Sequence, residues 1–416
     1  MDTILTINIV IAVVFTCCYA YQLFFLAVPF TKKQEPHKPE VLHRFAILIC
    51  ARNEEAVIAD LIQSIRHQTY DQSLLTVFVM ADNCTDATAD IARREGAVVY
   101  TRFNREKVGK GYALEQLLLH IEEDYPKVYD GFFVFDADNV ADEQFLARMN
   151  DAFCAGAQVC KGAMRAKNPY DSWLSGCYGL YFTLFDTFFS RARMSCGLSS
   201  KLVGTGFAVH RAVLERFGGW NTSTIAEDAE FAAQCAANGV RVCFVPGALT
   251  YDEAPNDFAV SLRQRRRWCS GIMDVAVRMD APLVSALRGS APLRALDALL
   301  IVNAPFLQAL TLLPLTLTIL SSLVQGTAGT LALTGAVSLT LSTLGLMALA
   351  ALLAYLGGYR DRRVVRTVAG FPLFMAAWLP LQLVSLVSRT RSWQPIAHTR
   401  AVRAENLHDA GFLTTI

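Results

Sequence analysis

Four long apolar stretches constrain this chain more than any other feature of its sequence. They cover residues 7–30, 298–324, 331–356 and 367–388. Each is about as long as the ~20 predominantly apolar residues that an α-helix needs to cross a bilayer. Most of the Lys, Arg, Asp and Glu residues lie between the first two stretches, within residues 32–294. We therefore expect a polar domain between membrane-spanning helices.

The first apolar stretch has the features of a membrane anchor. A cleavable signal peptide has a basic start and a small-residue cleavage site, whereas this chain opens with Met1-Asp2 and stays apolar through "YQLFFLAVPF". We expect residues 1–31 to form an N-terminal transmembrane anchor. Basic residues follow it directly, namely Lys32, Lys33, Lys38 and Arg44. By the positive-inside rule, they predict a multi-pass protein of the plasma membrane with a cytoplasmic polar domain.

The later stretches predict about three transmembrane helices within residues 298–390. Their connectors agree with a cytoplasmic start, because "QGTAGT" is uncharged and "RDRRVVR" (360–366) carries the arginines typical of an inner loop.

The last stretch conflicts with this charge pattern, because Arg389 and further arginines follow it. Either the charge rule fails here or one stretch is re-entrant. Pro372 and Pro380 make the last stretch the candidate. A tail at residues 391–416, with "RSWQPIAH" at its start, could then fold back towards the cytoplasmic side.

Short apolar strands alternate with helical patterns across the polar domain, which we place at residues 32–256. The expected strands are "FAILIC" (45–50), "LLTVFVMAD" (74–82), "AVVYT" (97–101) and "GFFVFDAD" (131–138). Near-continuous apolar strands joined by helices are typical of a parallel sheet covered on both faces. The predicted fold class is α/β, doubly wound around a mostly parallel sheet.

Acidic side chains follow three of these strands, at the edge where doubly wound sheets bind ligands. Glu54 follows the first strand, Asp82 ends the second, and Asp136 and Asp138 end the fourth. Any single one of these polar positions has a structural explanation as a helix cap. A D-x-D segment is harder to explain in that way, because it directs two carboxylates to the same side. Such oxygen ligands suit Mg²⁺ or Mn²⁺, and a bound metal can neutralise a diphosphate leaving group.

Residues 201–239 combine glycines with a cluster of acids. Gly204 and Gly206 permit tight turns or close backbone approach, and Glu227 and Asp228 open a helical pattern. The helix dipole favours acids in a first turn, which is a sufficient structural reason for them. An acid in a cleft can instead act as a general base.

The segment "SLRQRRRWCSGI" (261–272) concentrates arginines and a tryptophan shortly before the chain turns apolar. We place it in amphipathic interface helices over residues 257–297. A basic patch of this kind attracts anionic lipid. The guanidinium of Arg267 also suits phosphate oxygens, and Trp268 offers a flat apolar face to a sugar. Because charge is balanced elsewhere, nucleic-acid binding is not expected.

Seven motifs, in this order, resemble the membrane-integrated family 2 glycosyltransferases, the group that includes cellulose, chitin and hyaluronan synthases. They are "CARNEE", "ADNCTD", "GKGYAL", "DAD", "GTGFAVHR", "AEDAEF" and "QRRRW". The resemblance implies a GT-A fold, a nucleotide-sugar donor that is usually a UDP-sugar, and a divalent metal ion, Mg²⁺ or Mn²⁺.

The resemblance also implies roles for the residues at matching positions. The implied donor-binding residues are Glu54, Asp82, Lys110, Asp136 and Arg267. The implied metal ligands are Asp138 and Asp136, and the implied general base is Asp228. The implied acceptor contacts are Trp268, Gln264 and Gly206.

These residues lead to one principal hypothesis and two alternatives. The principal hypothesis is an inverting, processive glycosyltransferase that extends a polysaccharide from a UDP-sugar at the cytoplasmic face and passes it across the membrane. The first alternative is a non-processive transferase that adds one sugar to a lipid. The second is a transporter or receptor that binds nucleotide sugars without turnover. Membrane lipid is an expected partner in each case.

Overall fold

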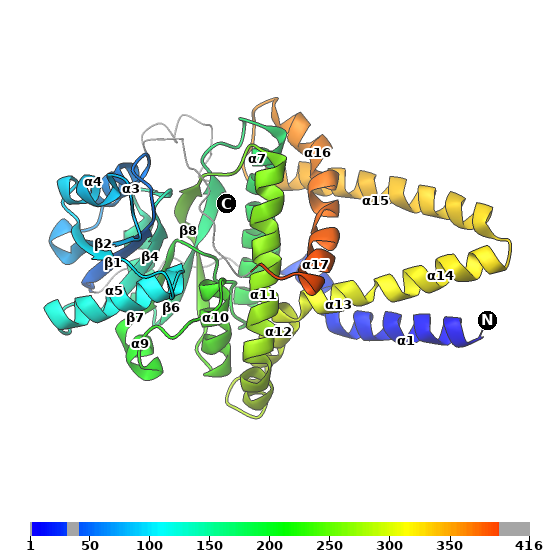
Figure 1. The fold of residues 1–416 in the computed structure, drawn as a ribbon, viewed down its shortest axis with the longest axis horizontal. Helices are drawn as coiled ribbons and strands as arrows, with labels where there is room; N and C mark the ends of the chain where they lie inside the picture. Colours follow the sequence, from blue (N-terminus) through cyan, green and yellow to red (C-terminus); the bar gives the residue numbers. More distant parts are fainter. Residues whose placement is uncertain (1, 31–40, 391–416) are drawn as a thin grey trace.

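An eight-stranded sheet forms the centre of the polar domain in the computed structural model, which describes residues 2–30 and 41–390 (Figure 1). The strand order is β3-β2-β1-β4-β7-β6-β8-β5. Strands β7 and β5 run against the other six, so the sheet is mixed but mostly parallel. The strands are β1 (Phe45–Ala51), β2 (Leu75–Asp82), β3 (Val98–Arg102), β4 (Gly131–Asp136), β5 (Val140–Ala141), β6 (Val159–Ala166), β7 (Phe207–His210) and β8 (Val242–Asp252).

Helices cover both faces of this sheet, because both faces of β1 are apolar. Phe45, Ile47 and Ile49 pack on one face with helices α3 and α6, whereas Ala46 and Leu48 pack on the other with α5, α9 and α10. The prediction of a doubly wound, mostly parallel α/β domain is therefore confirmed. The covering helices are α3 (Ile58–Arg66), η2 (Gln72–Leu74), α4 (Thr88–Arg94), α5 (Lys110–Asp124), α6 (Phe145–Cys154), α9 (Arg211–Phe217) and α10 (Glu227–Ala237).

A second, helical part adjoins the domain and extends into a long arm (Figure 1). Next to the domain lie α7 (Trp173–Leu184), the π-helical segment η3 (Phe185–Arg191), α8 (Ala192–Ser195), α11 (Phe258–Ala286) and α12 (Pro292–Val302). The remaining helices are α1 (Asp2–Tyr19), α2 (Tyr21–Phe24), η1 (Val28–Phe30), α13 (Ala304–Leu310), α14 (Leu312–Val324), α15 (Ala328–Leu356), α16 (Val364–Ala376) and α17 (Trp378–Val387).

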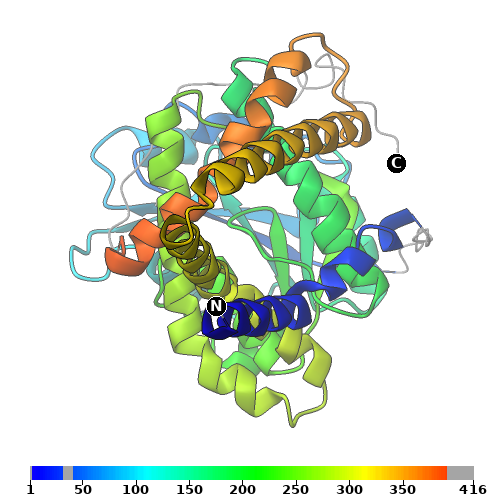
Figure 2. The ribbon, with the colours of Figure 1, turned by 90° about the vertical axis from the view of Figure 1, so that its right-hand side faces the viewer.

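Four segments of the described residues are long and apolar enough to cross a membrane, and they correspond to the four apolar stretches of the sequence. They are Thr3–Phe30, Ala304–Val324, Ala328–Leu356 and Val364–Val387. The first three form the arm, in which α1 lies against α14 while α14 and α15 make a hairpin (Figures 1 and 2). Most of the surface of the arm is exposed and apolar.

The fourth segment, Val364–Val387, differs from the other three because it runs across the direction of the arm, beside α11 (Figure 1). Near its start, the carbonyl of Thr367 accepts a hydrogen bond from Cys177 of α7. Just after its end, Arg389 forms a 2.8 Å ion pair with Asp274 of α11. Both ends of this segment therefore rest on helices that adjoin the domain. The predicted tail at 391–416 and the basic residues at 32–38 lie outside the described residues.

A buried ion pair joins the base of the arm to the domain. Arg193 of α8 is fully buried and contacts both carboxylate oxygens of Asp297 in α12, at 2.9 and 3.2 Å. The Tyr21 hydroxyl donates a hydrogen bond to the same carboxylate at 2.9 Å, and Gln22 accepts one from Arg193. Helices α2, α8 and α12 are far apart in the sequence, and this network joins them in the folded protein. It therefore holds the N-terminal helices against the helices that adjoin the domain.

Replacing Asp297 with alanine should destabilise the protein by about 3–5 kcal/mol, because the change leaves the Arg193 charge buried without its partner. The thermal unfolding midpoint of the detergent-solubilised protein measures the effect. The double change Arg193→Met with Asp297→Leu should recover most of the loss. Asp90→Ala is the control, since it breaks the exposed Asp90–Arg93 pair and should hardly move the midpoint. An unchanged midpoint for Asp297→Ala would contradict this account.

Candidate active site

A cavity of about 550 Å³ lies at the carboxyl ends of the parallel strands, where the domain meets α11. Residues after β1, β2, β4 and β8 line it, together with the loop before β7 and the first turns of α5 and α10. The cavity brings together all but one of the residues predicted from the sequence. Its lining includes Glu54, Asp82, Lys110, Asp136, Asp138, Asp228, Gln264, Arg267 and Trp268.

Gly206 is the predicted residue that does not line the cavity. Its N–H donates to the carbonyl of Val134, and its own carbonyl accepts from Gly162, both at 2.9 Å. Its φ is 62°, and an added Cβ would lie 2.8 Å from the Thr250 side chain. A glycine is therefore required here for the close packing of strands β4, β6 and β8.

Lys110 connects the acidic groups at one end of the cavity. It follows Gly109, whose φ of 147° favours glycine, and it begins α5. Its ammonium group lies 2.5 Å from Asp136 and 3.8 Å from Glu227, and it donates to the carbonyl of Gly204. Burial lowers the pKa of Lys110, but the two carboxylates outweigh burial and leave it raised. Lys110 is thus a permanent positive charge between three chain segments.

Asp228 lies in the first turn of α10 and faces the same cavity. One carboxylate oxygen accepts the N–H of Gly204, and the other accepts the N–H of Ala229 at 2.7 Å. These two bonds hold the carboxylate in one orientation. Its neighbour Glu227 is buried, and burial, partly offset by Lys110, raises the pKa of Glu227 to about 7. Glu227 also lines the cavity, although the family resemblance implied a role only for Asp228.

Three carboxylates gather at the end of β4 and β8. Asp136 and Asp138 were expected there, whereas Asp252 was not, although it also ends an apolar strand. Burial raises the pKa of Asp252 well above its usual range, and the nearby charges of Asp138 and Asp136 raise it further. Such a concentration of buried negative charge suits a cation. Within the described residues, no group of three or more His, Cys, Asp and Glu side chains forms a complete metal site.

Asp82 and Glu54 line the cavity beside β1 and β2. Asp82 is buried and forms a 2.6 Å ion pair with Arg102 of β3. The backbone N–H of Glu54 donates to the Thr88 hydroxyl at 2.8 Å. Burial raises the pKa of Glu54 to about 8, and the charge of Asp138 adds to the effect. Glu54 is therefore electrostatically coupled to the carboxylates at the end of β4.

Helix α11 supplies the opposite wall. The side-chain carbonyl of Gln264 accepts a 2.9 Å hydrogen bond from the Tyr178 hydroxyl. The ring of Trp268 lies edge-on to Tyr178 and stacks on Trp378, with centroids 6.1 and 6.2 Å apart. Burial leaves the pKa of Asp136 raised, although the charge of Lys110 and, to a smaller extent, that of Arg267 lower it. Tyr178 and Trp378 thus position the amide of Gln264 and the ring of Trp268 in the cavity wall.

The cavity continues away from the acids towards the base of the arm. This end is lined by Tyr181, Phe185, Ile272, Pro305, Trp378 and Gln382, which come from α7, η3, α11, α13 and α17. Nothing in the sequence marks these residues, because side chains in apolar helical stretches have no distinguishing local pattern. The packing of α17 on α11 brings Trp378 and Gln382 to the cavity.

Comparison with known proteins supports an enzymatic role for this site. The family model described as "Glycosyltransferase like family 2" matches residues 43–271, more than half of the chain. The "Probable glycosyltransferase YdaM" of Bacillus subtilis is 28% identical over 272 residues, which are 63% of this chain and 62% of the relative. The "Beta-monoglucosyldiacylglycerol synthase" of a Nostoc species is 28% identical over 237 residues, 54% of this chain and 48% of the relative.

A further relative, the "Poly-beta-1,6-N-acetyl-D-glucosamine synthase" of Staphylococcus aureus, is 21% identical over 250 residues, 58% of each chain. This chain therefore spans less than two thirds of the length of these curated relatives. A solved mannosyltransferase from Pyrobaculum calidifontis, in complex with GDP-Man and Mn²⁺, superposes with a TM-score of 0.59 at 18% identity and covers 92% of this chain and 99% of that chain. The shared architecture confirms the GT-A fold. The chain belongs to the family 2 glycosyltransferases and is a membrane-associated member of that family.

Proposed function

We propose that the protein transfers a single sugar from a nucleoside-diphosphate sugar to a lipid acceptor at the membrane surface. The main support for this proposal is the position of the two ends of the cavity. It runs from the carboxylates at the sheet edge to Pro305, Trp378 and Gln382 at the base of the arm. A nucleotide sugar suits the polar end, while the apolar end adjoins helices long enough to enter a bilayer. A lipid headgroup could therefore reach the acids while its chains stay in the membrane.

The exposure of the arm also supports a lipid acceptor. The apolar windows of its three candidate spans are only 6%, 6% and 11% buried within the described residues. A polysaccharide that crosses a bilayer needs a path shielded from the hydrocarbon. Helices that bury so little surface against one another do not enclose such a path within residues 2–30 and 41–390. The name of the Nostoc relative, a monoglucosyldiacylglycerol synthase, also denotes synthesis of a glycolipid.

In the proposed reaction, Asp228 is the general base. It would accept the proton of the acceptor hydroxyl while that oxygen attacks the anomeric carbon of the donor. The bond from this carbon to the diphosphate breaks, its electron pair leaves with the diphosphate, and the configuration inverts. The hydrogen bonds from Gly204 and Ala229 keep the carboxylate oriented for this step.

The leaving diphosphate needs compensating positive charge. Arg267 is the guanidinium on the wall opposite the acids and would bind phosphate oxygens. Asp136 and Asp138 supply only two carboxylates, which fits an Mg²⁺ or Mn²⁺ ion bound by one or two carboxylates plus substrate phosphates. Such an ion would neutralise charge on the diphosphate. Lys110 would hold Asp136 in place beside it.

Processive synthesis of a polysaccharide, the principal hypothesis from the sequence, stays as a second candidate. The observation that favours it is that Gln264, Arg267 and Trp268, the residues through which the chain resembles polymer synthases, all line the cavity. The Staphylococcus aureus relative is also named as a polymer synthase.

We further propose that the arm crosses the bilayer three times and that Val364–Val387 does not cross it. The ion pair of Arg389 with Asp274 supports this arrangement, because it keeps the end of the segment beside α11. It also removes the conflict with the positive-inside rule, since Arg389 would stay on the side of the domain.

The change Asp228→Asn should lower kcat by roughly 10²–10⁴-fold, since the amide keeps the shape of the carboxylate but cannot accept the proton. The affinity for the nucleotide-sugar donor should change little. Release of nucleoside diphosphate and equilibrium binding of the donor measure the two effects. Glu215→Gln, at an exposed position of α9, is the matched control. Unchanged turnover in Asp228→Asn would exclude Asp228 as the base.

Product size tests the single-transfer proposal. Purified protein in lipid vesicles, given labelled UDP-sugars or GDP-sugars and Mg²⁺ or Mn²⁺, should yield one lipid-soluble product that carries one sugar. Thin-layer chromatography and mass spectrometry identify it. A ladder of water-soluble polymers would instead favour the processive enzyme. If no donor leads to release of nucleoside diphosphate, the result would favour a transporter or receptor that binds nucleotide sugars without turnover.

Epitope accessibility tests the proposed three crossings. In intact cells, an epitope inserted after Gly326, between α14 and α15, should react with antibody from the outside. Epitopes inserted after Gly358 or added at residue 416 should react only after the membrane is permeabilised. Labelling of the epitope at residue 416 in intact cells would show that Val364–Val387 crosses the bilayer.

A further inference from the structure

Two lysines in the cavity have no role in the chemistry proposed above. Lys161 lies on β6 and Lys201 lies in the loop before β7, and both line the cavity. Lys161 is only 3% exposed, and its ammonium group donates to the carbonyl of Gly162 at 2.7 Å. The ammonium group of Lys201 lies 4.4 Å from the centroid of the Phe185 ring. Within the described residues, that carbonyl and that ring are the only close partners of the two charges.

Burial makes both charges costly. It lowers the pKa of Lys161 to about 8, despite the opposing effect of nearby carboxylates, and it also lowers the pKa of Lys201. Asp186, the acid with the largest effect on Lys161, already forms a 3.0 Å ion pair with Arg165. A buried cation without an ion-pair partner normally binds an anion or loses its proton. The two lysines are therefore suited to a negatively charged group of a ligand.

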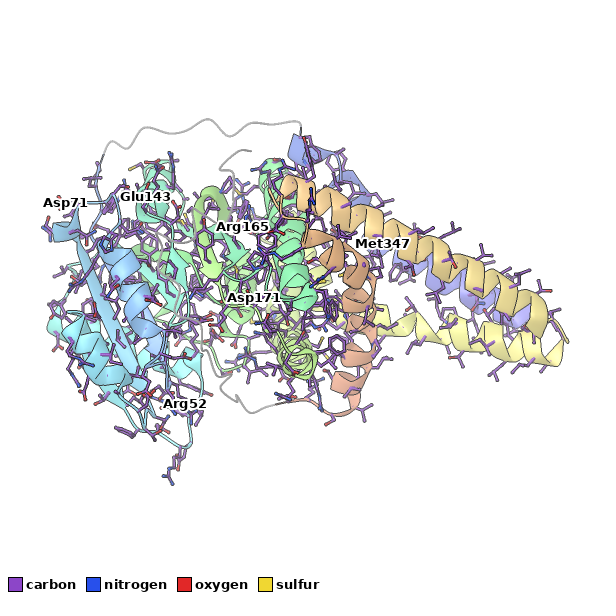
Figure 3. All side chains as sticks on the ribbon, turned by 90° about the horizontal axis from the view of Figure 1, so that it is seen from above. Arg52, Asp71, Glu143, Arg165, Asp171 and Met347 are labelled. Atoms are coloured by element: carbon purple, nitrogen blue, oxygen red, sulfur yellow. The ribbon has the colours of Figure 1, made fainter. Side chains whose placement is uncertain are left out.

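The two lysines line the cavity from β6 and from the loop before β7, in the half that we assign to the acceptor. Strand β6 is separated from β4, which carries Asp136, by β7. The charge of Asp228 acts on both lysines, so an anion bound there would lie next to the proposed base. In Figure 3, Arg52, which lines the acidic end, is well separated from Arg165, which stands beside this second end.

The local backbone also marks this half as a binding site. The π-helical segment η3 interrupts the helix between α7 and α8 and brings Phe185, Asp186 and Ser190 to the cavity wall. π-helical segments are rare, and those within α-helices are frequently found at functional sites. The rings of Phe185 and Trp378 then continue the wall towards the arm. A ligand with a negatively charged group next to an apolar chain would therefore fit this half of the cavity, because the lysines lie beside the aromatic rings.

We propose that Lys161 and Lys201 bind a phosphate group of the lipid acceptor, so that the enzyme selects anionic lipids over neutral ones. This inference rests on the proposed function and adds a property of the acceptor to it. The phosphate would lie between the two ammonium groups, and the reacting oxygen of the lipid would lie towards Asp228. The diphosphate of the donor also carries phosphate charge. Arg267 and a metal ion bound by Asp136 and Asp138 would bind that diphosphate instead.

Matched lipids test the inference on the full-length protein in vesicles. Phosphatidylglycerol, which carries a phosphate beside its free hydroxyl, is compared with diacylglycerol at equal mole fractions and with one labelled donor. The wild-type protein should transfer sugar to the phosphate-bearing member of the pair at least roughly 10-fold faster than to its neutral counterpart, the ratio expected for one charge-assisted contact. Inorganic phosphate should compete with the acceptor and not with the donor.

Variants assign the effect to the lysines. Lys201→Gln should raise KM for the phosphate-bearing acceptor roughly 10- to 100-fold without raising KM for the donor, and Lys201→Arg should restore most of the affinity. Lys127→Gln, which removes a surface charge remote from the cavity, is the matched control. Thermal unfolding midpoints establish that each variant is folded, and the phosphate competition needs no variant.

The outcomes separate the inference from the function on which it rests. Equal transfer to phosphate-bearing and neutral lipids would overturn the inference and keep the lipid acceptor. A raised donor KM in Lys201→Gln would also overturn it, because the lysines would then bind the donor diphosphate. A polymer product with no transfer to any lipid would overturn the proposed function itself.

Discussion

A single buried ammonium group holds the acidic end of the cavity together. Lys110 reaches the carboxylates of Asp136 and Glu227 and the carbonyl of Gly204, and Gly204 in turn donates its N–H to Asp228. Buried like charges repel strongly unless a counter-charge lies among them. Without Lys110, the acids at the end of β4 and at the start of α10 would destabilise one another. With it, these acids can face one small volume.

Helices α11 and α17 complete the cavity on the side opposite the acids, and α16 supports them. Arg265 is fully buried, donates to the carbonyl of Phe374 at 2.7 Å and stacks against the Phe374 ring, so it connects α11 to α16 rather than to lipid. This contact and the Arg389–Asp274 pair hold α17 against α11, which brings Trp378 to the cavity. The apolar segment at 364–387 thus contributes to the site instead of extending with the arm.

Much of the site could be predicted because its signals are local. Each of Asp82, Asp136 and Asp138 ends or directly follows an apolar strand, and parallel strands necessarily bring their carboxyl ends to one edge. Asp252 follows the same rule at the end of β8 but was missed, because the mixed second half of the sheet lacks the regular strand–helix alternation.

Gly206 was assigned to the acceptor from a motif, yet its neighbours show a packing constraint. Lys161 and Lys201 have no sequence signal, since isolated lysines are usually solvated surface residues.

The sequence by itself determined the class of the fold, the four apolar stretches and the acidic strand ends, because periodicity, segment length and motif order are properties of neighbouring residues. Only the tertiary structure decided which apolar segment turns back onto the domain, how Lys110 pairs with acids from distant segments, and which lysines face the second half of the cavity. Those features depend on contacts between residues far apart in the chain, such as Arg389 with Asp274 and Lys201 with Phe185. The free energy of such contacts comes from burial and charge neutralisation, which exist only after the chain has folded.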